Sequence, residues 1–129
     1  MRKIFLLMAT ATLLLTGCKK QTFDERVQTE VENFNLKEAP KQLDPYTSFD
    51  SMRYDADIHT VHYYYTVSGD ADGDLFPAEE LKQQLVSNVR NSLQLKAHKE
   101  HGLSFHYVYQ SQSSGLSLID CTVKPEDYK

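Results

Sequence analysis

Residues 58–67, which read IHTVHYYYTV, form the clearest strand in the sequence. Apart from two histidines, the stretch is an unbroken run of β-branched and aromatic residues, and Ser68-Gly69-Asp70 ends it in a turn. Side chains alternate between the two faces of a strand. We therefore expect one face to lie in the core, made of Val61, Tyr63, Tyr65 and Val67, and the opposite face to carry Thr60, His62, Tyr64 and Thr66.

Three further strands are predicted around this one. A strand over residues 47–54 precedes it, joined by a turn at residues 55–57. Downstream, a strand over residues 103–109 has one strongly aromatic face, and a last strand over residues 116–123 follows the Ser113-Ser114-Gly115 turn. Pro125 stops that strand and a short acidic tail follows.

Apolar residues at helical spacing predict two helices. Phe23, Val27, Val31 and Phe34 indicate a helix over residues 22–36, and Pro40 and Pro45 bracket a loop after it. A second helix of twenty-odd residues begins near Pro77, with an apolar stripe, basic residues at its end and Gly102 as its left-handed cap. The stripe consists of Leu81, Leu85, Val89 and Leu93.

The element order predicts the fold class. The predicted order is a helix, two strands, a second helix and two more strands. Strands that pair in hairpins in this way are typical of an α+β fold. We expect a single small domain over residues 23–129, in which a helix packs on one face of a mostly antiparallel four-stranded sheet.

The amino terminus has the layout of a secretory signal peptide. Arg2 and Lys3 precede an apolar run over residues 4–15 that is shorter than the roughly twenty residues of a membrane-spanning helix. Residues 15–18, which read LTGC, resemble the lipobox of bacterial lipoprotein precursors. This resemblance implies cleavage after residue 17 and acylation of Cys18.

Acylation of Cys18 would anchor the chain to a membrane through several acyl chains, with residues 18–22 as a lipidated tether. By the same resemblance, Lys19 after the cysteine favours the outer membrane of the bacterial envelope, with the domain on either its periplasmic or its outer side.

Charge excludes one class of partner. Without residues 1–17, 12 basic and 18 acidic residues remain, a formal charge of −6. A nucleic-acid-binding protein would need a basic patch, so we expect no nucleic-acid partner. Nor does an acidic domain attract anionic lipid, so membrane attachment depends on Cys18.

The sequence predicts neither a metal site nor a cofactor. In the Asp70-Ala71-Asp72-Gly73-Asp74 loop, glycine falls at the fourth position and Leu81 at the twelfth, where a calcium-binding EF-hand needs glycine sixth and glutamate twelfth. His59 and His62 face opposite sides of a strand, while His98 and His101 suit the negative end of a helix dipole.

Motifs for catalysis are missing as well. No Gly-x-Ser-x-Gly or glycine-rich phosphate loop occurs. Cys121 alternates with Ile119 and Val123, so we expect a small buried hydrophobic residue rather than a nucleophile. We therefore expect no enzyme.

Tyrosine supplies the remaining functional signal. Tyr64 shares the outer strand face with His62, and His106 joins them if their strands are neighbours. Tyrosine is enriched at protein interfaces, which makes His62, Tyr64 and His106 a candidate binding surface. The favoured function is a membrane-anchored envelope lipoprotein that binds an envelope or secreted protein. The alternatives are a glycan- or peptidoglycan-binding module, and a hydrolase whose site is assembled from scattered residues.

Overall fold

The computed structural model describes residues 21–129. The predicted signal peptide (residues 1–17) and Cys18 lie outside the described residues. Within them, no helix has the length and apolar character needed to cross a membrane. The helices are α2 (Phe23–Glu38), α3 (Ala78–Asn91), α4 (Lys96–Glu100) and α5 (Pro125–Tyr128), with 3-10 turns at η1 (Ala56–Ile58) and η2 (Gly69–Ala71). The strands are β1 (Lys41–Asp44), β2 (Thr47–Asp55), β3 (Thr60–Val67), β4 (Ser104–Ser111) and β5 (Ser117–Val123).

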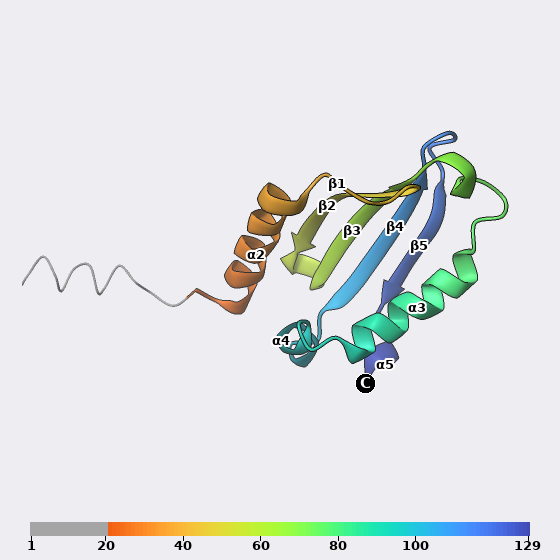
Figure 1. The fold of residues 1–129 in the computed structure, drawn as a ribbon. Helices are drawn as coiled ribbons and strands as arrows, with labels where there is room; N and C mark the ends of the chain where they lie inside the picture. Colours follow the sequence, from red (N-terminus) through yellow and green to blue (C-terminus); the bar gives the residue numbers. More distant parts are fainter. Residues whose placement is uncertain (1–20) are drawn as a thin grey trace, which may run out of the picture.

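The sheet has five strands in the order β1-β2-β3-β4-β5, and the helices lie on one of its faces (Figure 1). The predicted α+β class is confirmed, and so are the β2–β3 and β4–β5 hairpins. The prediction of four strands is wrong, whereas three of the four strand pairs are antiparallel, in agreement with a mostly antiparallel sheet. A fifth strand is present, and the central pair, β3 and β4, is parallel.

The parallel pair follows from the connection between its strands. Residues 68–103 leave the end of β3 and must return to the opposite end of the sheet, which takes a crossover and not a hairpin. The crossover contains α3 and α4. In the resulting register, His62 lies opposite His106, Tyr63 opposite Tyr107 and Tyr65 opposite Tyr109.

Strand β1 occupies the loop predicted between Pro40 and Pro45. Its four residues are all exposed and pair with the start of β2. Periodicity missed this strand because an exposed edge strand buries neither face and carries no apolar alternation.

The core lies between the sheet and the helices. The predicted inner face of β3 is confirmed, since Val61 and Val67 are buried and Tyr63 and Tyr65 pack against the core. Its most fully buried side chains come from α2, α3, β3, β4 and β5 and from the residue before β4: Val27, Val89, Val61, Val67, Phe105, Ile119, Val123 and Leu103.

Two stacked tyrosine pairs join the central strands on this inner face. The rings of Tyr63 and Tyr107 are 4.7 Å apart, and those of Tyr65 and Tyr109 are 4.3 Å apart. Both pairs are nearly parallel and combine a large apolar area with hydroxyl groups at the ring ends.

The predicted second helix is broken in two. Helix α3 ends at Asn91, Ser92 adopts an extended conformation, and the Ser92 hydroxyl accepts a hydrogen bond from the Leu95 amide (3.3 Å). Leu93, expected on the buried stripe, is 87% exposed as a result. The predicted cap at Gly102 is confirmed by its positive φ of 73°.

The chain end is a helix rather than a tail. Tyr128 of α5 is buried, and its hydroxyl donates to the carbonyl of Leu103 (2.8 Å). The four residues after Pro125 do not by themselves predict this helix, because the carbonyl that Tyr128 binds lies 25 residues earlier in the sequence.

Helix α2 is held to the rest of the domain near its first turn. Thr22 and Glu25 form a capping box at its start. The Tyr54 hydroxyl of β2 donates to the Asp24 carboxylate (2.6 Å), and the ring of Phe23 stacks on His101 with centroids 3.6 Å apart.

A side-chain amide fixes the other end of α2. The Asn35 amide donates to the Met52 carbonyl (2.8 Å) and accepts from the Met52 amide (2.9 Å). Met52 lies beyond the part of β2 that β1 covers, so Asn35 takes the place of a strand partner at this open edge.

We expect Asn35→Ala to lower the free energy of unfolding by about 1–2 kcal/mol, because both partly buried backbone groups of Met52 lose their partner. Urea denaturation measures this. Asn33→Ala, an exposed position on the same helix, is the matched control and should change stability by less than about 0.5 kcal/mol. Equal effects of the two substitutions would contradict the role given to Asn35.

Candidate functional site

An apolar groove opens on the helix-covered side of the sheet, between α2, β1 and the connection from α3 to α4. Its volume is about 510 Å³, within the range of ligand-binding clefts. The break after α3 contributes Ser92, Gln94 and Leu95 to its wall, so a single long helix would not leave this opening. The remaining lining comes from α2, β1, β2 and β3: Phe34, Glu38, Lys41, Leu43, Phe49, Met52, Tyr63 and Tyr65.

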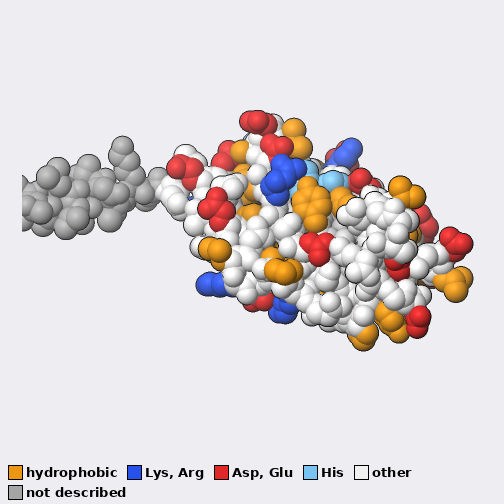
Figure 2. Space-filling model, turned by 90° about the horizontal axis from the view of Figure 1, so that it is seen from above, with side chains coloured by type: hydrophobic (Ala, Val, Ile, Leu, Met, Phe, Trp, Pro, Cys, Tyr) orange, Lys and Arg blue, Asp and Glu red, His pale blue; other side chains and the backbone are white. Residues whose placement is uncertain are grey.

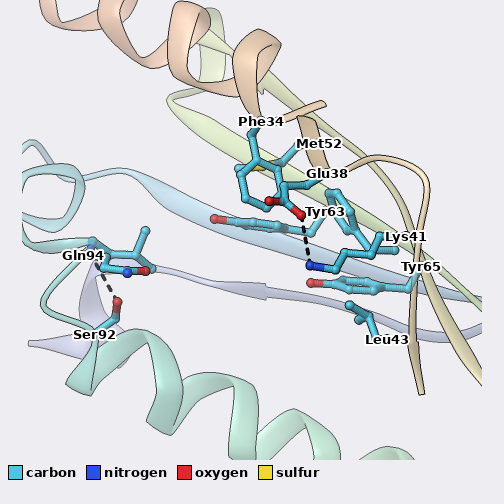
Figure 3. Close-up of a pocket in the computed structure, with 11 residues that line it drawn as sticks. Phe34, Glu38, Lys41, Leu43, Met52, Tyr63, Tyr65, Ser92 and Gln94 are labelled. Atoms are coloured by element: carbon cyan, nitrogen blue, oxygen red, sulfur yellow. Dashed lines mark hydrogen bonds and ion pairs between the residues drawn. The ribbon is translucent and has the colours of Figure 1, made fainter. Parts of the chain in front are cut away.

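The floor of the groove is aromatic. Tyr63 and Tyr65 extend from β3 into it side by side (Figure 3). Burial raises the pKa of Tyr65 to about 12 and raises that of Tyr63 as well, so both keep their hydroxyl protons at neutral pH. The floor can therefore pack against apolar groups and also form hydrogen bonds at the hydroxyls.

The rim of the groove combines exposed apolar residues with one ion pair. Phe34 is 44% and Leu43 52% exposed, and the Phe34 ring meets Phe49 edge-on with centroids 5.5 Å apart. Lys41 Nζ lies 3.0 Å from Glu38 Oε2 beside the tyrosines (Figure 3). Exposed apolar side chains beside a polar pair offer a partner both apolar contact and hydrogen bonds.

The groove continues beneath α2. A second cavity of about 220 Å³ shares Phe34, Met52, Tyr63, Gln94 and Leu95 with the first. It reaches the core residues Val27, Val31 and Val61. The lining consists of apolar side chains with a few hydrogen-bonding groups, and such a surface is suited to binding a ligand or a protein segment.

The residues of this groove were not predicted from the sequence to come together. Phe34 was expected on the packed stripe of the first helix, whereas it is half exposed at the rim. Leu43 lies between Pro40 and Pro45, in the segment that was predicted to be a loop. An apolar residue between those prolines was the one local signal for an exposed contact residue.

The predicted surface of His62, Tyr64 and His106 lies on the opposite face of the sheet. His62 Nδ1 and His106 Nδ1 are 2.7 Å apart, and the Tyr64 hydroxyl accepts a hydrogen bond from Arg53 (3.3 Å). The structure thus brings the three residues onto one face. His62 is only 7% exposed, however, so a partner on this face would mainly contact its neighbours.

Charged groups are dispersed over the face of the domain that Figure 2 shows. In the view from above, acidic side chains are scattered and basic ones do not gather in one area (Figure 2). Histidine side chains reach this face beside a basic and a hydrophobic one (Figure 2).

The acidic loop before α3 has a structural role. The Asp72 carboxylate accepts hydrogen bonds from the Ser111 hydroxyl (2.5 Å) and the Ser113 amide (3.0 Å), which tie the loop to the β4–β5 turn. These bonds lower the pKa of Asp72. Within residues 21–129, no group of three or more His, Cys, Asp or Glu side chains is placed to hold a metal ion.

Two other histidines, His98 and His101, make contacts that hold helix α2 in place. His98 Nε2 lies 3.3 Å from the Glu30 carboxylate, and the His101 ring stacks on the Phe23 ring. Both attach α4 to α2, which adds a tertiary reason for their presence to the helix-dipole argument.

A family model described as a domain of unknown function (DUF8479) matches residues 22–119. The chain belongs to this family. The match begins at the capping residue of α2 and ends within β5, so it covers β1 to β4, the start of β5 and the residues that line the groove. No curated protein matches the chain in sequence.

Solved structures share the fold of this DUF8479 domain at low sequence identity. The pilotin EpsS of the Vibrio vulnificus type 2 secretion system superposes with a TM-score of 0.67 at 15% identity, covering 82% of this chain and 91% of EpsS. The type II secretion pilotin AspS of Vibrio cholerae gives 0.61 at 15% identity, covering 81% and 90%. A candidate secreted protein of Pseudomonas aeruginosa gives 0.63 at 8% identity, covering 86% and 100%.

Cys121 is half-buried at the inner side of β5, less deeply than Ile119 and Val123. Burial raises the pKa of the Cys121 thiol, which lowers the fraction of reactive thiolate. The prediction of a packing residue fits this position better than a nucleophile does.

We expect a disulfide reagent to modify Cys121 at pH 8 several-fold more slowly in the native chain than in urea, because the thiolate is scarcer and less accessible. A Cys18→Ser background leaves Cys121 as the single thiol for absorbance measurements. Equal rates in the two states would contradict its protection.

Proposed function

We propose that this chain is an envelope lipoprotein, anchored through acyl chains on Cys18, whose α+β domain binds a segment of a partner protein in the apolar groove. The observation that carries the proposal is the groove itself, with exposed Phe34 and Leu43 at its rim and two tyrosines on its floor. No catalytic reaction is assigned to the chain.

The fold supports this class of function. Two of the structures with the same architecture are pilotins of type II secretion systems, and the resemblance extends over nine-tenths or more of each. We therefore propose an envelope partner, and specifically a component of a secretion apparatus.

The chemistry of the groove defines what such a partner segment must offer. Apolar side chains would enter between Phe34, Leu43 and Met52 and displace water from them. Backbone groups of the segment would reach the hydroxyls of Tyr63 and Tyr65. The Glu38–Lys41 pair at the rim would contact polar residues flanking the apolar ones.

The proposed anchor limits where this partner can be. Four residues separate Cys18 from the start of α2 at Phe23, a reach of about 15 Å when extended. The domain would remain against the membrane surface, so the partner segment must come close to the lipid headgroups.

We expect Leu43→Ser to weaken capture of the partner at least tenfold in a crosslinking pull-down from envelopes, because a segment that fills the groove would cover Leu43 and burying a leucine side chain contributes about 1.5–3 kcal/mol. Leu116→Ser is the matched control, since Leu116 is also exposed but lies in the β4–β5 turn. It should capture the partner as the unsubstituted chain does.

Tyr64→Ala distinguishes the groove from the opposite sheet face. Loss of capture with Tyr64→Ala and its retention with Leu43→Ser would overturn the groove as the site and restore the predicted surface of His62, Tyr64 and His106. Glycan binding would be indicated instead if the chain sedimented with purified cell-wall material independently of Leu43.

For the anchor, we expect Cys18→Ser to abolish metabolic labelling of the chain with a radioactive fatty acid, because the acylated sulfur is removed. Cys121→Ser is the matched control and should label normally. Labelling that persists without Cys18 would exclude the proposed lipidation site.

A further inference from the structure

Three side chains form a chain of hydrogen bonds across the helix-free face of the sheet. The Asp120 carboxylate of β5 lies 2.6 Å from His106 Nε2 on β4. His106 Nδ1 lies 2.7 Å from His62 Nδ1 on β3, with the two rings perpendicular. We call Asp120, His106 and His62 the histidine chain.

The carboxylate determines where the protons of this chain reside. A carboxylate only accepts, so His106 Nε2 must carry a hydrogen to make the 2.6 Å contact. In neutral His106 the other nitrogen, Nδ1, then carries no hydrogen and can only accept a hydrogen bond. The 2.7 Å contact requires a donor there, so His62 carries its proton on Nδ1 and donates it to His106.

His62 is enclosed at the far end of the histidine chain. It is 7% exposed, and its Nε2 is buried with no hydrogen-bond partner among the described residues. On the neighbouring strand β2, Arg53 lies directly opposite His62 in the register, and Asp55 is the second charged residue near the ring. Tyr64, on β3 itself, accepts a hydrogen bond from Arg53, and His106 and Asp120 complete the titratable groups around the ring.

We propose that the histidine chain is a proton-sensitive element of the fold, stable while both rings are neutral and destabilised when either ring gains a second proton. A proton added at His62 Nε2 would create a buried cation with an unpaired N–H group beside the Arg53 guanidinium. A proton added instead at His106 Nδ1 would place its N–H group against that of His62 Nδ1 and break the 2.7 Å contact.

The direction of the pH effect follows from the surroundings of His62. Burial, the positive charge of Arg53 and the neighbouring His106 lower the pKa of His62 in the folded chain. The unfolded chain, with an ordinary histidine pKa near 6.5, then binds more protons than the folded one below that pH. The stabilisation is fully present above about pH 7.5 and is lost as the pH falls through 6.5 toward the lower folded-state pKa.

The position of the histidine chain makes its opening consequential. His62 and His106 are paired residues of β3 and β4, the parallel strands at the centre of the sheet. Opening would change the surface formed by Arg53, Tyr64 and the two rings, while the groove lies on the other face. This inference does not depend on the proposed function.

Nitrogen-15 NMR of the histidine rings in the full chain tests the proposal directly. At pH 7.5 we expect a protonated Nδ1 for His62 and a protonated Nε2 for His106, and a titration midpoint for His62 below the ordinary histidine value of about 6.5. A His62 midpoint at or above 6.5, or a protonated Nδ1 on neutral His106, would overturn the proposal.

Thermal unfolding at pH 7.5 and pH 5.5 gives a second test. His62→Asn keeps an amide donor near the Nδ1 position but does not titrate, so the fall in Tm between the two pH values should be on the order of 5 °C smaller than in the unsubstituted chain. His59→Asn is the matched control, because His59 is exposed and its φ of 49° suits asparagine. It should keep the full pH dependence.

The same fall in Tm for His62→Asn and the unsubstituted chain would contradict the role of His62. If the variant does not fold, the NMR titration of the unsubstituted chain still decides the question.

Discussion

The parallel pairing of β3 and β4 is the constraint on which the rest of the structure depends. Two parallel neighbours cannot be joined by a tight turn, so 36 residues of connection, residues 68–103, are committed to crossing back over the sheet. That crossover supplies α3, which covers the core, and the break before α4, which leaves the groove open. The same pairing aligns the tyrosine stacks on one face and the two histidines on the other.

The two faces of these central strands have opposite chemistry. The inner face joins β3 to β4 through stacked aromatic rings, whose contact is insensitive to pH in the physiological range. The outer face joins the same two strands through a hydrogen bond between imidazole rings, which depends on the protonation state of both. The centre of the sheet therefore combines a constant contact with a titratable one at adjacent positions.

The features that the sequence predicts are those that repeat locally. Alternation identified the inner face of β3, and i+4 spacing identified α2 and most of α3. The break at Ser92 was not predictable, because the groups that bond around it, the Ser92 hydroxyl and the Lys99 ammonium, lie within an otherwise helical pattern. Strand β1 was missed because it buries no side chain, and α5 because its stability comes from Tyr128 reaching Leu103.

The candidate sites were predicted to different extents for the same reason. Placing His62, Tyr64 and His106 on one face needed only strand parity and the assumption of neighbouring strands. The groove needed the separation between α2 and the α3–α4 connection, which Asn35 helps to set by binding the backbone of Met52. Nothing in the pattern around Asn35 distinguishes it from the exposed Asn33.

The adjacency of His62 and Tyr63 has a consequence for how the sequence can change. Consecutive residues of β3 serve opposite faces, so inserting or deleting one residue there would exchange the two faces over the remainder of the strand. Histidine would then enter the apolar groove and tyrosine would replace it in the hydrogen-bonded chain. Length variation among members of the family should therefore be confined to the loops, such as residues 68–77 and 112–116, and be excluded from the ten residues that first identified the fold.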